Sequence, residues 1–253
     1  MLKLFPLYMP QFQEERMIHM YLPDDYPNTT KRYPVLYMFD GHNLFDDSMA
    51  TYGRSWRIGQ YLQSNHIDCI VVGQECSHQG NKRLDEYGPY PFHSEFAEES
   101  FSGHGLDTMH FFVDTLKPYI DANYRTKKER KYTWIAGSSC GGLMAYYASI
   151  KFSRTYSKAV CVSPYFHPTM AYLYQDTKNT RMNKNTAFYL SWGSKETGSH
   201  GFVKETIDCL SLANLLIQNH IPVHFNVKED GRHCEEDWEK EVPEIFDFLW
   251  TGL

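Results

Sequence analysis

The segment Gly137-Ser-Ser139-Cys-Gly141 has the clearest chemical meaning in this chain of 253 residues. It matches G-x-S-x-G, with Ser139 at the centre. The apolar run 132–136 before it predicts a buried strand, and small residues follow at helical spacing. A strand that turns abruptly into a helix holds its central residue in a strained, exposed position, which glycines beside it make possible. A serine hydroxyl at that point, next to a helix N-terminus, is placed for nucleophilic attack.

Other chemistries fit this segment less well. The dinucleotide-binding spacing G-x-G-x-x-G is absent, and no G-K-[ST] marks a phosphate-binding loop. Cys140 is an alternative nucleophile, because thiol hydrolases with G-x-C-x-G exist. In that frame Ser138 stands where the elbow needs a glycine, so the pattern favours Ser139.

Composition excludes several kinds of partner. The formal net charge is −6, so no nucleic-acid partner is expected, and no apolar run approaches the length of a membrane span. The apolar stretch within residues 1–10 is too short for the apolar region of a signal peptide, and two prolines interrupt it. Six cysteines without a C-x-x-C pair fit free thiols in a reducing cytoplasm. The 12 histidines show no tight ligand spacing, so neither a metal nor a cofactor is expected.

The elements that must position Ser139 alternate along the chain. Apolar runs predict strands, and amphipathic periodicity predicts helices between them. The alternation predicts an α/β fold: a doubly wound, mostly parallel sheet with helices on both faces. We expect one domain over residues 1–253, with a small cap at 165–185. The predicted strands are 15–22, 35–39, 68–73, 132–136, 159–163, 186–192 and 222–227; the predicted helices are 56–62, 106–124, 202–219 and a C-terminal helix that Pro243 kinks or splits.

Four chemically useful groups follow predicted strands. Because the carboxyl ends of parallel strands meet at one edge, we expect 40–42, Ser139, Glu196 and His233 to gather there. Serine, acid and histidine stand in the chain order of α/β-hydrolases. Neutral His233 would take the Ser139 proton while Glu196 holds the imidazole tautomer. Backbone N–H groups of His42 and Cys140 would stabilise the oxyanion.

At family level the sequence resembles the putative-esterase branch of the α/β-hydrolases, which includes esterase D, feruloyl and siderophore esterases and mycolyltransferases. The matching stretches run through most of the chain: 33–45, 83–87, 116–121, 135–142 and 231–233. Members commonly have Met after the nucleophile and Gln after Asp-Gly, where this chain has Cys140 and His42. The resemblance implies an α/β-hydrolase fold and an ester hydrolase.

Substrate contacts are less clearly marked. Candidates are residues of the 41–43 loop, residues of the long aromatic-rich segment 75–105, and an aromatic residue at a strand end. They are Gly41, Asn43, Arg83, Glu86, Tyr87 and Trp192. Arg83, Glu86 and Tyr87 either orient a substrate or stabilise the long loop 75–105. Trp192 belongs to the core or to the pocket wall. For the triad acid, Asp230 and Glu205 remain alternatives to Glu196.

The sequence therefore predicts a cytoplasmic serine ester hydrolase that works through an acyl-enzyme without a cofactor. Its expected partner is a small-molecule ester with a short acyl or aromatic group, including carbohydrate-linked esters. We expect a monomer or a homodimer. Three alternatives stay open: an acyltransferase, a thioesterase or peptidase on the same triad, and a catalytically silent binding protein.

Overall fold

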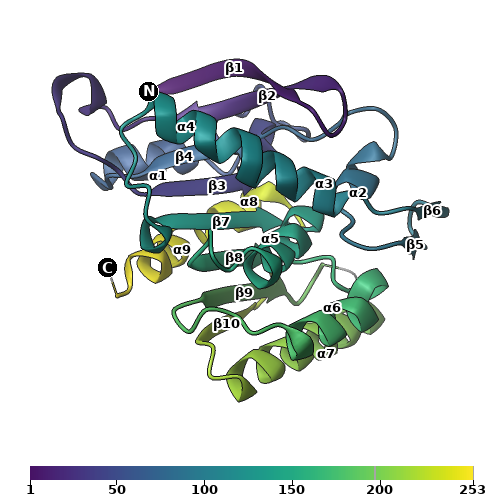
Figure 1. Cartoon of the computed structure of the whole chain (residues 1–253). Coiled ribbons are helices and arrows are strands. Elements are labelled where there is room, and N and C mark those ends of the chain that lie inside the picture. Colours follow the sequence, from purple (N-terminus) through teal and green to yellow (C-terminus); the bar gives the residue numbers. More distant parts are fainter. Residues whose placement is uncertain (197, 253) are drawn as a thin grey trace.

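A computed structural model describes residues 1–196 and 198–252, and one large sheet runs through it (Figure 1). The sheet has eight strands in the order β1-β2-β4-β3-β7-β8-β9-β10. From β4 to β10 all neighbours are parallel, whereas β1 pairs antiparallel with β2 and β2 pairs antiparallel with β4. The predicted mostly parallel α/β sheet is confirmed.

The strands follow the chain with helices between them. Their bounds are β1 (Leu2–Met9), β2 (Glu14–Tyr21), β3 (Val35–Phe39), β4 (Ile70–Gln74), β7 (Thr133–Ser138), β8 (Lys158–Val162), β9 (Ala187–Gly193) and β10 (Val223–Lys228). Every residue of β3, β4 and β7 is buried, as expected for strands covered on both faces.

Helices cover both faces of the sheet. On one face lie α3 (Gly105–His110), the π-helical turn 111–116, α4 (Lys117–Asn123), α5 (Cys140–Lys151), α6 (Met170–Asn179) and α7 (Gly198–Gln218). On the other lie α1 (Ile58–Ser64), α8 (Glu235–Glu239) and α9 (Val242–Trp250). Each face has its own apolar core: Met144 and Leu212 belong to the first, and Leu62 and Phe246 to the second.

The structure departs from the sequence expectations in three places. Leu2–Met9 forms a strand that the sequence analysis did not predict; it is mostly exposed at the edge of the sheet, where Pro6 is tolerated. The segment 75–105 contains α2 (Lys82–Glu86) and a small hairpin of β5 (Phe92–Ser94) and β6 (Glu99–Phe101). The predicted helix 106–124 is interrupted by the π-helical turn.

Other connections are short helical turns. They are η1 (Tyr26–Asn28), η2 (Gly41–Asn43), η4 (Arg130–Tyr132) and η5 (His167–Thr169). The segment expected to be a cap contains η5 and α6, and α6 packs against α5 and α7. Pro243 separates α8 from α9 and stands in the first turn of α9, where a missing N–H costs nothing. No helix in the described ranges is both long and apolar enough to cross a bilayer.

Candidate active site

Ser139 lies between β7 and α5 in a strained conformation. Its φ is 57° and its ψ −124°, a region that residues with a side chain rarely occupy. The turn is tight because a Cβ on Gly137 would lie only 2.5 Å from the carbonyl carbon of Gly141. Ser139 itself is partly exposed, at the N-terminus of a twelve-residue helix. The expected strand–turn–helix around the serine is present.

Glu196 and His233 are joined although 37 residues separate them. His233 Nδ1 lies 3.0 Å from Glu196 Oε2, and the Glu196 side chain is only 2% exposed. β9 and β10 are parallel neighbours, so the loops after them meet at one sheet edge. Within the described residues no hydrogen bond joins Ser139 to His233, and such contacts often tighten only when substrate binds.

Ser163 and Trp238 complete the surroundings of Glu196, and the sequence analysis assigned neither. The Ser163 hydroxyl donates to Glu196 Oε1 at 2.6 Å, and Trp238 Nε1–H donates to the Ser163 oxygen at 2.8 Å. The Gly193 N–H also donates to Glu196 Oε1. The Trp238 ring contacts the His233 ring edge-on, with centroids 5.0 Å apart. The signal available in the sequence was the position of Ser163 directly after β8, at the same sheet edge.

The alternatives for nucleophile and acid occupy different surroundings. The Cys140 thiol is buried, and burial raises its pKa, so the reactive thiolate is disfavoured. The Asp230 side chain is 70% exposed and forms an ion pair with Lys195. Glu205 lies on α7, beside a cavity treated below.

The loop after β3 presents a second set of groups at the same edge. Asp40 adopts a left-handed conformation, with φ 56°, and η2 begins directly after it. A Cβ on Gly41 would lie 2.6 Å from the Gly73 carbonyl oxygen, so only glycine allows the loop to pack on β4. In the described part of the chain, neither the His42 N–H nor the Cys140 N–H donates to a backbone carbonyl. The backbone of the described residues thus leaves both of these N–H groups without an acceptor.

Arg83 and Tyr87 stabilise this loop through hydrogen bonds with Asp40, the residue directly before η2. Arg83 donates to both carboxylate oxygens of Asp40, at 2.8 and 2.7 Å. The Asp40 N–H donates to the Tyr87 hydroxyl, which in turn donates to Gln74 Oε1 at 2.8 Å. Burial alone would raise the pKa of Asp40, but the Arg83 guanidinium outweighs it and holds the pKa below its usual range. The pair fixes the loop that carries the His42 N–H.

Replacing Arg83 with methionine is expected to lower the free energy of unfolding by about 3 kcal/mol at neutral pH, because it leaves the Asp40 carboxylate buried without its cation. The pKa of Asp40 is lowered in the folded protein, so the pair stabilises above the ordinary carboxyl pKa and the stabilisation is lost as pH falls. In Arg83→Met the burial of Asp40 acts without its cation and raises the pKa of this carboxyl, so the variant regains stability as Asp40 protonates. The difference in stability between Arg83→Met and wild type should therefore narrow as pH falls from 7 towards 4. Urea unfolding across that range measures it.

The control for this experiment is Arg54→Met, which removes a half-exposed ion pair with Glu239. Such a pair contributes less than about 1 kcal/mol. A stability difference for Arg83→Met that does not change with pH would contradict the assigned role of Asp40.

The remaining candidates lie around this framework. Asn43 bridges to the start of α8, because its Nδ2 donates to the buried Glu235 at 3.1 Å. Glu86 is buried and accepts from Arg16 at 2.7 Å and from the Ser77 N–H at 3.0 Å. Trp192 is 1% exposed and donates to Thr206 Oγ1 at 2.9 Å. Each of these three side chains thus connects two separate segments of the chain through its hydrogen bonds.

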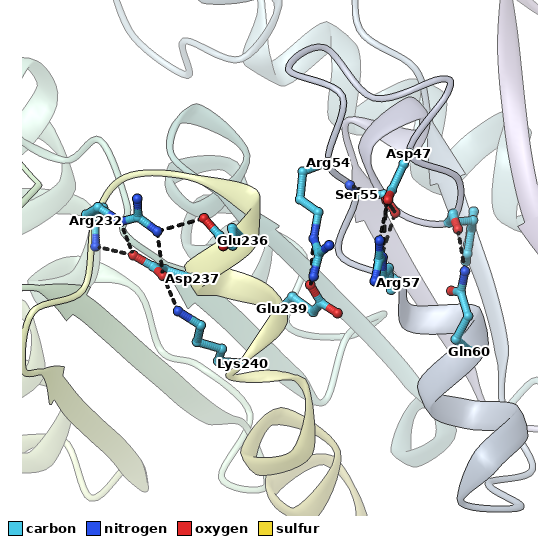
Figure 2. Close-up of polar contacts among 11 residues, drawn as sticks. Asp47, Arg54, Ser55, Arg57, Gln60, Arg232, Glu236, Asp237, Glu239 and Lys240 are labelled. Carbon is cyan, nitrogen blue, oxygen red and sulfur yellow. Dashed lines mark hydrogen bonds and ion pairs between the residues drawn. The ribbon is translucent and has the colours of Figure 1, made fainter.

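Ion pairs fasten α8, the helix that follows His233. Arg232 contacts both Glu236 and Asp237, and Lys240 also reaches Asp237 (Figure 2). Arg54, from the segment before α1, contacts Glu239 on the same helix (Figure 2). Arg232, the residue before His233, is thus bound to α8, and α8 in turn is bound by Arg54 in the segment that follows η2.

This strained serine at a strand–helix turn, with an acid–histidine pair at the same sheet edge, defines an α/β-hydrolase. The chain belongs to the family described as "Putative esterase", whose model matches residues 10–249. Membership in this family makes it an enzyme, a serine esterase that acts on carboxylic esters.

Individual relatives are distant. The uncharacterized protein YbbA of Bacillus subtilis (strain 168) is 25% identical over 224 residues, which are 85% of this chain and 79% of that protein. A solved ferulic acid esterase superposes with a TM-score of 0.71 at 17% identity and covers 98% of this chain and 97% of its own. The enterobactin esterase FES of Shigella flexneri has a TM-score of 0.78 at 16% identity, over 99% of this chain and 59% of that one. These structures share the fold.

Proposed function

We propose that this protein hydrolyses esters through a covalent acyl-enzyme on Ser139, with His233 as general base and Glu196 as the triad acid. The observation that carries the proposal is the Glu196–His233 contact of 3.0 Å, formed by a buried carboxylate that accepts two further hydrogen bonds. A carboxylate anchored in this way sets the imidazole tautomer, so that Nε2 is free to accept the serine proton.

The steps follow from these roles. Ser139 Oγ attacks the ester carbonyl carbon as its proton passes to His233 Nε2. The negative charge on the carbonyl oxygen is stabilised by the N–H groups of His42 and Cys140 and by the N-terminus of α5. His233 then protonates the leaving alcohol, and the acyl group stays on Ser139. Water, deprotonated by His233, attacks the acyl-enzyme; the bond between the acyl carbon and Ser139 Oγ then breaks, His233 returns the proton to Oγ, and the acid is released.

We assign positioning roles to the residues around the active site that the previous subsection described. We assign Arg83 and Tyr87 to the oxyanion loop, since both contact Asp40 directly before it. Asn43 links that loop to α8. Glu86 connects the segments around Arg16 and Ser77, and Trp192 connects β9 to α7. Ser163 holds the second oxygen of Glu196.

The substrate proposal rests on a cavity of about 420 Å³ beside the elbow. Its wall includes Phe96, Pro164, Tyr165 and Phe166, and the Tyr165 N–H donates to the Ser139 carbonyl at 3.0 Å. The wall also carries the charged residues Glu95, Lys204, Glu205 and Asp208, and its aromatic part suits a short acyl chain or one aromatic ring. We therefore propose short-chain or aromatic esters, including carbohydrate-linked ones, as substrates.

Purified protein is expected to cleave p-nitrophenyl esters of short acyl and aromatic acids, with a burst of p-nitrophenol from acyl-enzyme accumulation. Rates should fall as the acyl chain outgrows the cavity. Cleavage of none of these esters by folded protein would overturn the proposed function. A maximum at long acyl chains would overturn the substrate class alone.

Phe96→Ala tests the cavity more directly, because Phe96 lines it and is 76% exposed, so that folding tolerates the change. It should raise the KM of aromatic esters several-fold with less effect on acetyl esters. Tyr52→Ala, an 82% exposed aromatic outside that wall, is the matched control.

A further inference from the structure

Three side chains with metal-ligating atoms meet beside the oxyanion loop. His42, Cys76 and His78 each place one such atom within 4.8 Å of the other two. His42 belongs to η2 after β3, and the other two lie just after β4. β3 and β4 are parallel neighbours in register up to Phe39 and Gln74, so their following loops run side by side. Sequence spacing showed only Cys76-Ser-His78; the sheet supplies the third member.

The two imidazoles are already oriented through one ring nitrogen each. His42 Nε2 lies 3.0 Å from Thr51 Oγ1, and His78 Nε2 lies 2.7 Å from Glu75 Oε1. The other Glu75 oxygen is held by His19 Nε2 at 2.7 Å. A carboxylate or hydroxyl on one nitrogen is the arrangement that fixes metal-binding histidines in proteins. It leaves Nδ1 of each ring for a ligand.

His42 Nδ1 is the second, independent sign of a ligand. It is buried and has no hydrogen-bond partner within residues 1–196 and 198–252, and the His42 residue is only 6% exposed. A buried polar atom without a partner costs about 1–3 kcal/mol, so native structures rarely keep one without a reason. The rings of His42 and His78 lie edge to face with centroids 4.7 Å apart, and Cys76 is buried beside them.

We propose that His42, Cys76 and His78 bind a thiophilic divalent cation, Zn²⁺, through the two Nδ1 atoms and the Cys76 sulfur. Two imidazoles and a thiolate are a donor set that selects zinc over magnesium or calcium. As the sulfur–metal bond forms, the thiol proton leaves to solvent. The site does not depend on the proposed ester hydrolysis.

The geometry is close to what zinc requires. Zinc bonds of about 2.0–2.3 Å place tetrahedral ligand atoms roughly 3.5 Å apart, so the present separations of up to 4.8 Å must shrink by about 1 Å. The His78 side chain is 57% exposed and can make that adjustment. The exposed side of His78 also leaves a fourth position open to water.

Co²⁺ titration of the full chain tests the site, because a cysteine ligand produces a thiolate-to-cobalt absorption band. We expect one Co²⁺ per chain, displaced by Zn²⁺, and a Zn²⁺-dependent rise in melting temperature. Cys76→Ser should abolish the band. His78→Ala should weaken binding at least about tenfold, and Glu75→Ala about 10–100-fold.

Cys234→Ser, which removes a partly exposed thiol outside the cluster, should keep the band. A band that survives Cys76→Ser, or that Cys234→Ser removes, would overturn the proposal, as would folded wild-type protein that yields no band with Co²⁺. If Cys76→Ser does not fold, the exposed His78→Ala decides: unchanged Co²⁺ and Zn²⁺ affinity in that variant also overturns the site. Ester turnover plays no part in these readouts.

Discussion

Ser139→Ala is expected to lower kcat for ester hydrolysis by about 10⁴-fold or more, because it removes the atom that forms the acyl-enzyme. The residual rate would come from the oxyanion-stabilising groups and from substrate binding. A fluorophosphonate probe should label wild-type protein on Ser139, with the site mapped by mass spectrometry. The variant should not be labelled, since the probe reacts only with an activated hydroxyl.

Cys140→Ala is the matched variant for this experiment. It removes the neighbouring thiol but keeps the backbone N–H, so turnover should stay within about tenfold of wild type. Full activity in Ser139→Ala, with loss of activity in Cys140→Ala, would make the thiol the nucleophile. Folded wild-type protein that the probe fails to label would overturn the assignment of Ser139 as the nucleophile.

Glu196→Gln is expected to lower kcat by about 10³–10⁴-fold with little change in KM. The amide keeps the size of the side chain but can present N–H to His233 Nδ1, which favours the wrong imidazole tautomer. It also removes the charge that stabilises the imidazolium formed in the first step. Steady-state kinetics on a short p-nitrophenyl ester measures the loss.

Two further variants make this result specific. Ser163→Ala keeps the Glu196 charge but removes one hydrogen bond to it, worth about 1 kcal/mol, so a loss of roughly fivefold in kcat is expected. Glu15→Gln, the same chemical change at an exposed residue of β2, should stay within about twofold of wild-type turnover. Near-normal turnover in Glu196→Gln would place the triad acid elsewhere, and Asp230→Asn would then be the next variant.

Much of the fold was predictable because local patterns decide it. The runs 35–39 and 132–136 are almost continuously apolar, and the structure buries 35–39 and 133–136 in adjacent parallel strands. The strand at Leu2–Met9 was missed because an exposed edge strand is stabilised by its pairing with β2 rather than by a buried apolar face. The helix 106–124 was predicted as continuous because periodicity does not detect one π-helical turn within it.

The sequence alone predicted the class of chemistry, which the family confirms, and it points to Ser139 as the residue that would start the reaction. Glycines and small residues around Ser139 are local requirements of a strained turn, so they are readable from neighbours in the chain. Ser139, Glu196 and His233 each follow a strand, and the ends of parallel strands meet at one edge. Their shared position at that edge was therefore also predictable from the sequence.

Only the tertiary structure decided which distant side chains share an environment. The hydrogen bonds from Trp238 to Ser163 and from Ser163 to Glu196 join α8 to the loops after β8 and β9, and no local pattern marks them. In the same way, His42 meets Cys76 and His78 because β3 and β4 pair in one register. Local sequence sets the conformation of each turn, whereas the order and register of the strands set which turns become neighbours.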